Sequence, residues 1–282
     1  MNEVMNQLRS ARILMTGGTG FVGHAMREYF ELFDIDATLY ITSRKAKQPT
    51  QQGRVRVLPG SAATFNCPDN ITHIIHLEPD IHARMFALAI EHKCPLLFAS
   101  SGAARVESDY PDRGYVNAKR VGETMCWWAW QERGLHAKVA RLWSFVGPHL
   151  PLDSTYAIGN FIRDGLNGGP IVVKGDGKAV RSYLYTTDLA EWMWMILLRG
   201  RPGEIYNVGS EDYVSIKSLA EHIAYTMRHC DIIYANTLGD VGTRYVPVTL
   251  KTRHELGLEQ RVGLDEAIAK TIEWNRNNAN RQ

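Results

Sequence analysis

Short apolar runs alternate with helical patterns along the first 150 residues, and this alternation restricts the fold more than any other feature of the chain. Near-continuous apolar strands separated by helices are typical of a parallel sheet that helices cover on both faces. The sequence therefore predicts an α/β fold built on a doubly wound parallel sheet. The expected strands are residues 12–18, 38–43, 54–60, 73–78, 95–101 and 137–147, and the expected helices are residues 23–33, 83–93 and 115–133.

The pattern loosens after residue 150, which predicts a second, smaller lobe. A helix over residues 188–199 and a strand over 204–209 indicate a return to the sheet, and helical patterns follow at 215–228 and 264–275. A chain of 282 residues can bury one large core and a smaller appended one. We expect a sheet domain of residues 1–154 and 186–210, and a C-terminal lobe of residues 155–185 and 211–282.

Composition and charge exclude several classes of protein. The formal net charge is +2 and the basic residues are interleaved with acids, so no nucleic-acid partner is expected. The most apolar run, residues 192–198, is too short to span a bilayer, and the N-terminus has no apolar stretch typical of a signal peptide. We therefore expect no membrane partner. The four cysteines lie far apart and lack the spacing of metal ligands, so we expect reduced thiols, no metal site and a cytoplasmic location.

A glycine-rich loop, TGGTGFVG at residues 16–23, lies between the first expected strand and the first expected helix. Such glycines let the backbone approach a pyrophosphate, and a helix N-terminus offers free N–H groups and the positive end of a dipole. In this position the motif predicts that residues 1–154 and 186–210 form a Rossmann-type dinucleotide-binding domain. The residues expected to contact the dinucleotide here are Gly17, Thr19, Gly20, Phe21, Val22 and Gly23.

The end of the second expected strand indicates which dinucleotide is bound. An acid there would bond the 2′-hydroxyl of the adenosine ribose in NAD, whereas an arginine suits the 2′-phosphate of NADP. The strand ends in TSRK, with Ser43 and Arg44 where the acid would stand. A guanidinium can bind phosphate through two parallel hydrogen bonds, so we favour NADP(H) as the cofactor and keep NAD(H) as the alternative.

Tyr115 and Lys119 lie four residues apart in the expected helix 115–133, so their side chains share one face. A free phenol has a pKa of ~10 and is a poor base at neutral pH. An ammonium ~4–5 Å away contributes on the order of 3–4 kcal/mol at an effective dielectric of ~20, which brings the phenol within reach of neutral pH. The pair is therefore a candidate proton donor with the cation that tunes it.

Ser101 lies at the expected carboxyl end of the strand before this helix, in ASSGA at residues 99–103. Ligand sites in open α/β sheets form beyond the carboxyl ends of the strands. There the Ser101 hydroxyl would bond a substrate carbonyl beside the phenol, and Ser100 is the second choice. His76 and Leu77, at the end of the fourth expected strand, are also expected to line the cofactor site.

These motifs resemble those of the extended short-chain dehydrogenases/reductases that act on nucleotide sugars, the NAD-dependent epimerase/dehydratase family. The resemblance runs in order along essentially the whole chain. It rests on TGGTGFVG (16–23), HLE (76–78), SSGA (100–103), YVNAK (115–119), RLWSFVGP (141–148), GDGKAVRSYLYTTDLA (175–190) and YNVG (206–209). Residues 175–210 also look like those of reductases that act on dTDP-4-dehydro-6-deoxyglucose.

The resemblance implies a catalytic set of Ser101, Tyr115 and Lys119. In this set the serine orients the sugar, the tyrosine passes the proton, and the lysine holds the nicotinamide ribose and lowers the tyrosine pKa. The tyrosine and the lysine thus also belong to the cofactor site.

The resemblance also implies partners. A nucleotide-diphosphate sugar is the expected substrate and would bind in the C-terminal lobe, where Arg181 would contact its diphosphate. Asn160 and Arg244 are further candidates for that contact. Two subunits commonly pair in this family through the helix of the tyrosine and the lysine, so a homodimer is expected.

One departure from the family pattern bears on the reaction. The 4,6-dehydratases place an Asp–Glu pair directly after the serine position and the decarboxylases usually carry a glutamate nearby, whereas this chain has Gly102 and Ala103. This departure excludes a dehydratase, and the TSRK strand end favours reduction of a nucleotide-activated 4-keto-6-deoxy sugar, with Tyr115 as the proton donor. A C4-epimerase with tightly bound NAD and a non-catalytic dinucleotide-binding relative are the alternatives. The segment between Ser101 and Tyr115 is shorter than usual, which leaves the sugar and the base open.

Overall fold

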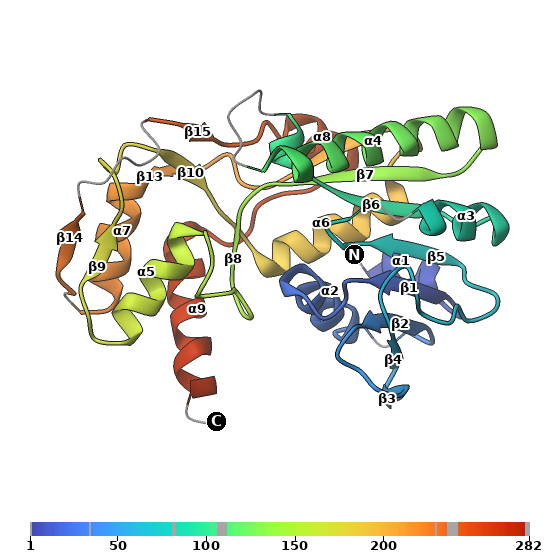
Figure 1. Ribbon diagram of the computed structural model, residues 1–282, viewed down its shortest axis with the longest axis horizontal. Coiled ribbons are helices and arrows are strands. Elements are labelled where there is room, and N and C mark those ends of the chain that lie inside the picture. The colour runs from blue at the N-terminus through green and yellow to red at the C-terminus, as the bar shows by residue number, and fades with distance from the viewer. Residues whose placement is uncertain are drawn as a thin grey trace. The chain divides into compact units, whose positions relative to one another are not determined.

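The structure is a computed structural model that describes residues 2–33, 35–80, 83–105, 112–228, 230–235 and 242–279. Its main feature is a large sheet. The strands of this sheet are β1 (Arg12–Thr16), β2 (Thr38–Ser43), β3 (Thr50–Gln52), β4 (Val55–Pro59), β5 (His73–His76), β6 (Leu96–Ser101), β7 (Ala137–Leu142) and β12 (Ile205–Val208). They lie side by side in the order β12-β7-β6-β5-β1-β2-β4-β3 (Figure 1).

All pairings in this sheet are parallel except that of β3, which runs antiparallel to β4 at one edge. A sheet that is covered on both faces has no solvent face, so its strands are apolar throughout. In β6, for example, every residue is buried. The predicted α/β fold with a parallel sheet is confirmed, and the carboxyl ends of the central strands meet at one edge.

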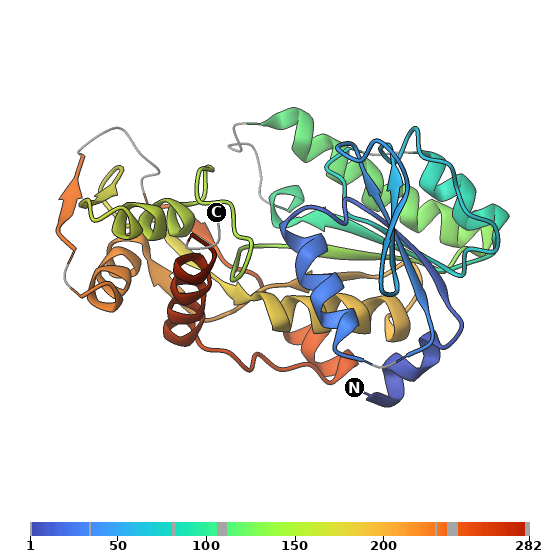
Figure 2. The same cartoon turned by 90° about the horizontal axis from the view of Figure 1, so that it is seen from below.

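Helices cover both faces of the sheet (Figures 1 and 2). On one face, α3 (Ala83–Glu91) and α4 (Arg113–Arg133) share a core with β1, β5, β6 and β7. On the other face, α2 (Phe21–Glu31) packs against α6 (Thr186–Arg199). The rings of Phe30 and Trp194 stack with their centroids 5.7 Å apart, and Trp194 Nε1 donates to the carbonyl of Met26 at 3.2 Å. These contacts bury the WMWMILL run inside the protein.

The chain forms two compact units. The first holds Met1–Leu142, Ala190–Val208 and Leu250–Leu258, and the second holds Trp143–Leu189, Gly209–Thr249 and Glu259–Gln282. This division places residues 143–154, 186–189, 209–210 and 250–258 differently from the domains expected above. The helix α8 (Leu250–Leu256) belongs to the first unit, because Thr252 Oγ1 donates to the carbonyl of Asn207 in β12 at 2.9 Å.

In the part of the chain that the structure describes, the second unit combines helices with short strands. The helices are α5 (Ala157–Leu166), α7 (Ile216–Thr226) and α9 (Leu264–Ala279). The small sheets join β10 (Val180–Ser182) to β13 (Tyr213–Ser215) and β15 (Arg244–Tyr245), β8 (Phe145–Val146) to β11 (Leu184–Tyr185), and β9 (Ile171–Val173) to β14 (Ile232–Tyr234). Buried Asp188 accepts hydrogen bonds from the N–H groups of Arg261 and Val262 at 3.0 and 3.1 Å, which fixes the chain ahead of α9.

A few short elements complete the fold. They are α1 (Asn2–Met5) and the 3-10 turns η1 (Asn6–Leu8) and η2 (Gly102–Ala104). Within the described residues, no helix combines the length and the apolar character needed to cross a membrane. The sequence patterns did not predict α1, β3 or α8, because each is too short to show a period, and β3 is an exposed polar edge.

The burial of His73 at the start of β5 predicts a pH dependence of stability. Burial, aided by the charge of Lys138, lowers the pKa of His73 from 6.5 to about 4. Between these two values the unfolded chain binds a proton that the folded chain does not, so the free energy of unfolding falls as the pH drops from about 6.5 to 4. We expect His73→Gln to remove on the order of 1–3 kcal/mol of this dependence, measured by urea unfolding at pH 7.5 and pH 5.

The matched control for this experiment is His254→Gln, at an exposed histidine of α8. This variant should keep the pH dependence of the free energy of unfolding that the parent protein has. An unchanged pH dependence in the His73 variant would show that the His73 imidazole does not cause it.

Candidate functional site

The glycine loop between β1 and α2 has the close backbone packing that a pyrophosphate site needs. Gly17 has a φ of +71°, and a Cβ on Gly23 would come within 2.6 Å of the Gly17 carbonyl oxygen. Gly20 is the N-cap of α2 and has no side chain to cover the first N–H groups of the helix. The loop therefore fits a dinucleotide phosphate group held at an open helix N-terminus.

The end of β2 presents a cation to solvent. Ser43 is buried, and its carbonyl accepts a hydrogen bond from the N–H of Gly60 at 3.0 Å. Arg44, the next residue, is exposed. The strand end thus has the residues that the sequence predicted for the adenosine side of the site, with the guanidinium accessible to a phosphate.

Glu78 brings a carboxylate to this same strand end from a different strand. It follows β5, yet its Oε1 accepts hydrogen bonds from the Thr42 hydroxyl at 3.2 Å and from the N–H of Ala62 at 3.0 Å. Sequence reasoning gave this acid no role. Its position in the HLE segment at residues 76–78 does not indicate where the side chain reaches.

His76 ties the ends of two central strands together. Its ring is fully buried, with Nδ1 2.6 Å from the hydroxyl of Thr16 and Nε2 3.0 Å from the carbonyl of Asp80. Both ring nitrogens are engaged within the protein. The histidine therefore fixes the ends of β1 and β5 beneath the glycine loop, and a contact between its ring and the cofactor stays a prediction, as does that of Leu77.

Tyr115 and Lys119 lie in the first turns of α4, as the sequence predicted. The helix begins at Asp112, whose Oδ1 accepts a hydrogen bond from the N–H of Tyr115 at 2.9 Å. This cap stabilises the turn that carries the phenol. Lys119 Nζ lies 5.7 Å from the centroid of the Tyr115 ring.

The ammonium of Lys119 is buried and bonded to the ends of two strands. Nζ donates to the carbonyl of Glu78 at 3.1 Å, beyond β5, and to the carbonyl of Ala99 at 2.9 Å, within β6. Burial lowers the pKa of Lys119 to about 8, while the charge of Asp80 acts in the opposite direction. The side chain therefore still carries its charge at pH 7, beside the phenol.

The two serines that end β6 have different surroundings. Ser100 Oγ donates to Glu123 Oε1 of α4 at 2.5 Å, so its hydroxyl is committed to that carboxylate. Ser101 Oγ accepts a hydrogen bond from the N–H of Ala103 at 3.2 Å and caps the turn η2. Adjacent residues of a strand point to opposite faces, which separates the two hydroxyls and favours Ser101 over Ser100 for a substrate contact.

A partly buried ion pair supports this corner of the site. Arg141 of β7 donates to both carboxylate oxygens of Glu123, at 2.9 and 2.6 Å, in the two-bond geometry typical of arginine. Together with Ser100, the ion pair of Arg141 and Glu123 joins α4 to β6 and β7 next to Ser101.

Comparison with known proteins agrees with this geometry. Residues 81–209 match the profile described as "NAD dependent epimerase/dehydratase family". The human dTDP-D-glucose 4,6-dehydratase is 24% identical over 95% of this chain and 90% of its own length. The UDP-glucuronic acid decarboxylase 1 of Xenopus tropicalis is 29% identical over 93% of this chain and 72% of its own length.

A solved structure agrees as well. The dTDP-glucose 4,6-dehydratase of Bacillus anthracis in complex with NAD superposes with a TM-score of 0.83 at 18% identity, over 96% of this chain and 98% of that one. The family match covers the middle of the chain, and the two relatives extend the likeness to nearly its whole length. The chain is thus similar to proteins of that family, and its fold is that of the solved dehydratase.

The residues that the family resemblance suggested for the substrate lie in the second unit. Arg181 of β10 donates to the carbonyls of Val180 and Thr243 at 2.9 and 3.0 Å. Arg244 of β15 lies over the ring of Tyr213, 4.1 Å from its centroid. Because β10 pairs with β15, the two guanidinium-bearing residues occupy neighbouring strands. Asn160 lies apart from them on α5, where its Oδ1 accepts a hydrogen bond from Arg163 at 3.2 Å.

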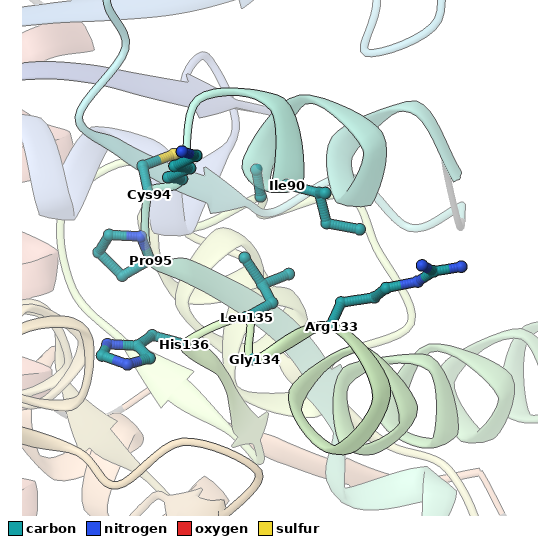
Figure 3. Close-up of a pocket in the computed structure, with 9 residues that line it drawn as sticks. Ile90, Cys94, Pro95, Arg133, Gly134, Leu135 and His136 are labelled. Atoms are coloured by element: carbon teal, nitrogen blue, oxygen red, sulfur yellow. The ribbon is translucent and has the colours of Figure 1, made fainter.

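A cavity of about 440 Å³ lies in the first unit, at the amino ends of β6 and β7 (Figure 3). Pro95 and His136, which precede these strands, line it together with the C-terminal ends of α3 and α4, and Arg133 points out to solvent. Ligand sites in open α/β sheets form at the carboxyl ends of the strands, so this cavity is not part of the candidate site.

Gly122 allows α4 to lie close enough to β6 for the lysine contacts. A Cβ at this position would come within 2.2 Å of Phe98 Cζ. We expect Gly122→Ala to displace the helix, to lower the free energy of unfolding by about 1–3 kcal/mol, and to reduce turnover. Urea unfolding and kinetics of the variant test this. Asn117→Ala, at an exposed position of the same helix, is the control, and equal behaviour of both variants would contradict the proposed packing constraint.

Proposed function

We propose that this chain is an NADP(H)-dependent oxidoreductase that reduces a nucleotide-activated 4-keto-6-deoxy sugar, with Tyr115 as the proton donor. The observation that carries the proposal is the charged, buried Lys119 beside the Tyr115 ring at the carboxyl edge of the sheet. A nearby ammonium stabilises the phenolate relative to the neutral phenol, which helps the phenol to give its proton to a substrate.

The proposed chemistry divides between the bound dinucleotide and three side chains. When bound, the reduced dinucleotide supplies the hydride to the carbonyl carbon of the sugar. Ser101 donates a hydrogen bond to the carbonyl oxygen, and Tyr115 gives that oxygen its proton. Lys119 stabilises the phenolate that remains, through its ammonium charge. The product is the alcohol, and the phenolate regains its proton from solvent.

Arginines of the second unit are the proposed substrate anchors. Arg181 and Arg244 lie on neighbouring strands, and two guanidinium groups suit the two phosphates of a nucleotide-diphosphate sugar. Asn160 stays a further candidate from α5. The proposal of a 4-keto-6-deoxy sugar rests on the resemblance of residues 175–210 to reductases that act on such sugars.

A C4-epimerase with tightly bound NAD is the second candidate. One observation favours it: the carboxylate of Glu78 lies at the end of β2, where an acid suits the ribose hydroxyl of NAD. The two reactions differ in stoichiometry, because an epimerase returns its hydride to the sugar and consumes no net reduced cofactor.

The surface of α4 supports the predicted homodimer. Trp127 and Trp128 are 54% and 45% exposed, and Val121 is exposed as well, whereas Trp130 packs against Gly203. Exposed apolar side chains that gather on one helix are common in subunit interfaces.

Replacement of the phenol tests the proposed proton donor. We expect Tyr115→Phe to lower the kcat for NADPH oxidation with a 4-keto-6-deoxy nucleotide sugar by about 10²–10⁴-fold, because the general acid is lost. The Kd for NADPH should change little. Tyr156→Phe, at an exposed tyrosine, is the control. Turnover that survives in the Tyr115 variant would remove this tyrosine from the mechanism, and isomerisation without net NADPH use would select the epimerase.

Replacement of Arg44 tests whether the protein binds NADP(H) or NAD(H). We expect Arg44→Ala to weaken NADPH binding by about ten- to a hundredfold, because a charged hydrogen bond to the 2′-phosphate is lost. NADH binding, which has no such phosphate, should stay the same. Nicotinamide fluorescence titrations measure both, with Arg105→Ala, at an exposed arginine beyond η2, as the control. Preference for NADH in the parent protein, unchanged in the variant, would contradict the NADP(H) assignment.

A further inference from the structure

The strand order divides the open edge of the sheet into two halves. β1 carries the glycine loop, with β5 and β6 on one side of it and β2 and β4 on the other. Lys119 bonds to the ends of β5 and β6, so the candidate chemistry lies on that side. A dinucleotide whose pyrophosphate lies at the loop then places its nicotinamide over β5 and β6 and its adenosine over β2 and β4.

The main chain and the side chain of Glu78 lie in different halves of this edge. Its main-chain carbonyl accepts a hydrogen bond from Lys119 on the nicotinamide side. Its main-chain nitrogen lies beside the glycine loop, because a Cβ on Gly17 would come within 3.2 Å of it. Its carboxylate lies on the adenosine side, bonded to Thr42 of β2 and to the N–H of Ala62 beyond β4. The side chain therefore crosses the end of β1 to reach the adenosine half.

The position of this carboxylate matters because β2 ends without an acid. The strand ends in Thr42 and Ser43, and Arg44 follows. Two hydrogen bonds hold the Glu78 carboxylate beside Thr42, so a fixed negative charge occupies the edge where a dinucleotide-binding sheet recognises the ribose. A carboxylate accepts a hydrogen bond from a ribose hydroxyl and repels a phosphate.

We propose that Glu78 is a specificity-determining residue, which supplies from β5 the carboxylate that β2 lacks and accepts a hydrogen bond from the 2′-hydroxyl of the adenosine ribose. The proposal rests on the proposed function only in that the chain binds a nicotinamide dinucleotide. Glu78 favours NAD(H) through this bond and opposes the 2′-phosphate of NADP(H) by its charge, whereas Arg44 acts in the opposite sense. The balance of these two residues sets the cofactor preference.

The test is the ratio of two dissociation constants, measured by nicotinamide fluorescence with NADH and NADPH. These ligands differ only in the 2′ group, so the ratio isolates the ribose contact. We expect Glu78→Gln and Glu78→Ala to raise the Kd for NADH by about ten- to a hundredfold and to leave that for NADPH unchanged or lower. Thr42→Val, which loosens the carboxylate without removing it, should move the ratio in the same direction by less.

Two controls guard against a structural effect. Glu132→Gln, at an exposed acid in the last turn of α4, should leave the ratio unchanged. Glu78→Gln keeps an oxygen that accepts from Thr42 and Ala62, so its thermal unfolding should match that of the parent protein.

The outcomes separate this proposal from the function proposed above. Equal weakening of both ligands, or an unchanged ratio, would overturn the role of Glu78, because the residue would then only shape the loop. If the parent protein binds both dinucleotides but turns over no keto sugar, the proposed reductase activity is wrong. The ratio of the dissociation constants for NADH and NADPH would still test the role of Glu78. A parent protein that binds neither dinucleotide would overturn both.

Discussion

The buried ammonium of Lys119 holds the functional edge of the sheet together. It bonds to the main-chain carbonyls of Glu78 and Ala99, at the ends of neighbouring strands, while its stem runs from α4. A charged group that leaves water needs such acceptors, because its hydration is lost. The fall of its pKa to about 8 reflects that loss, and the remaining charge faces the Tyr115 ring. The Lys119 ammonium therefore connects the Tyr115 phenol, the strand ends and the segment after β5.

This arrangement requires α4 to lie close to the sheet. Gly122, one turn beyond Lys119, leaves the space that the Phe98 ring fills. Glu123, the residue after Gly122, forms an ion pair with Arg141 that holds the helix against β7. Glu123 also accepts a hydrogen bond from the Ser100 hydroxyl, which keeps that hydroxyl from the open edge. Packing and electrostatics thus act together, because the helix must be close for the lysine to reach its carbonyls, and the ion pair keeps it close.

The sequence predicted the parts of this design that have a local period or motif. Apolar periodicity was sufficient for the parallel sheet and its covering helices, and the glycine spacing for the loop after β1. The position of Glu78 could not be predicted, because its carboxylate bonds to residues of β2 and of the segment after β4, far away in the chain. The short β3 and α8 were missed because a few residues show no pattern that chance would not also produce.

The reaction that such an edge can perform depends on the residues that surround Tyr115 and Lys119. The relatives compared above are named as a dehydratase and a decarboxylase, but Gly102 and Ala103 of this chain form the buried turn η2. Neither residue has a side chain that can exchange a proton with the sugar. Elimination of water needs a second acid–base group beside the phenol. Reduction of a ketone needs only one proton, which the phenol can supply, so the loss of these acids is consistent with transfer of a hydride and a single proton.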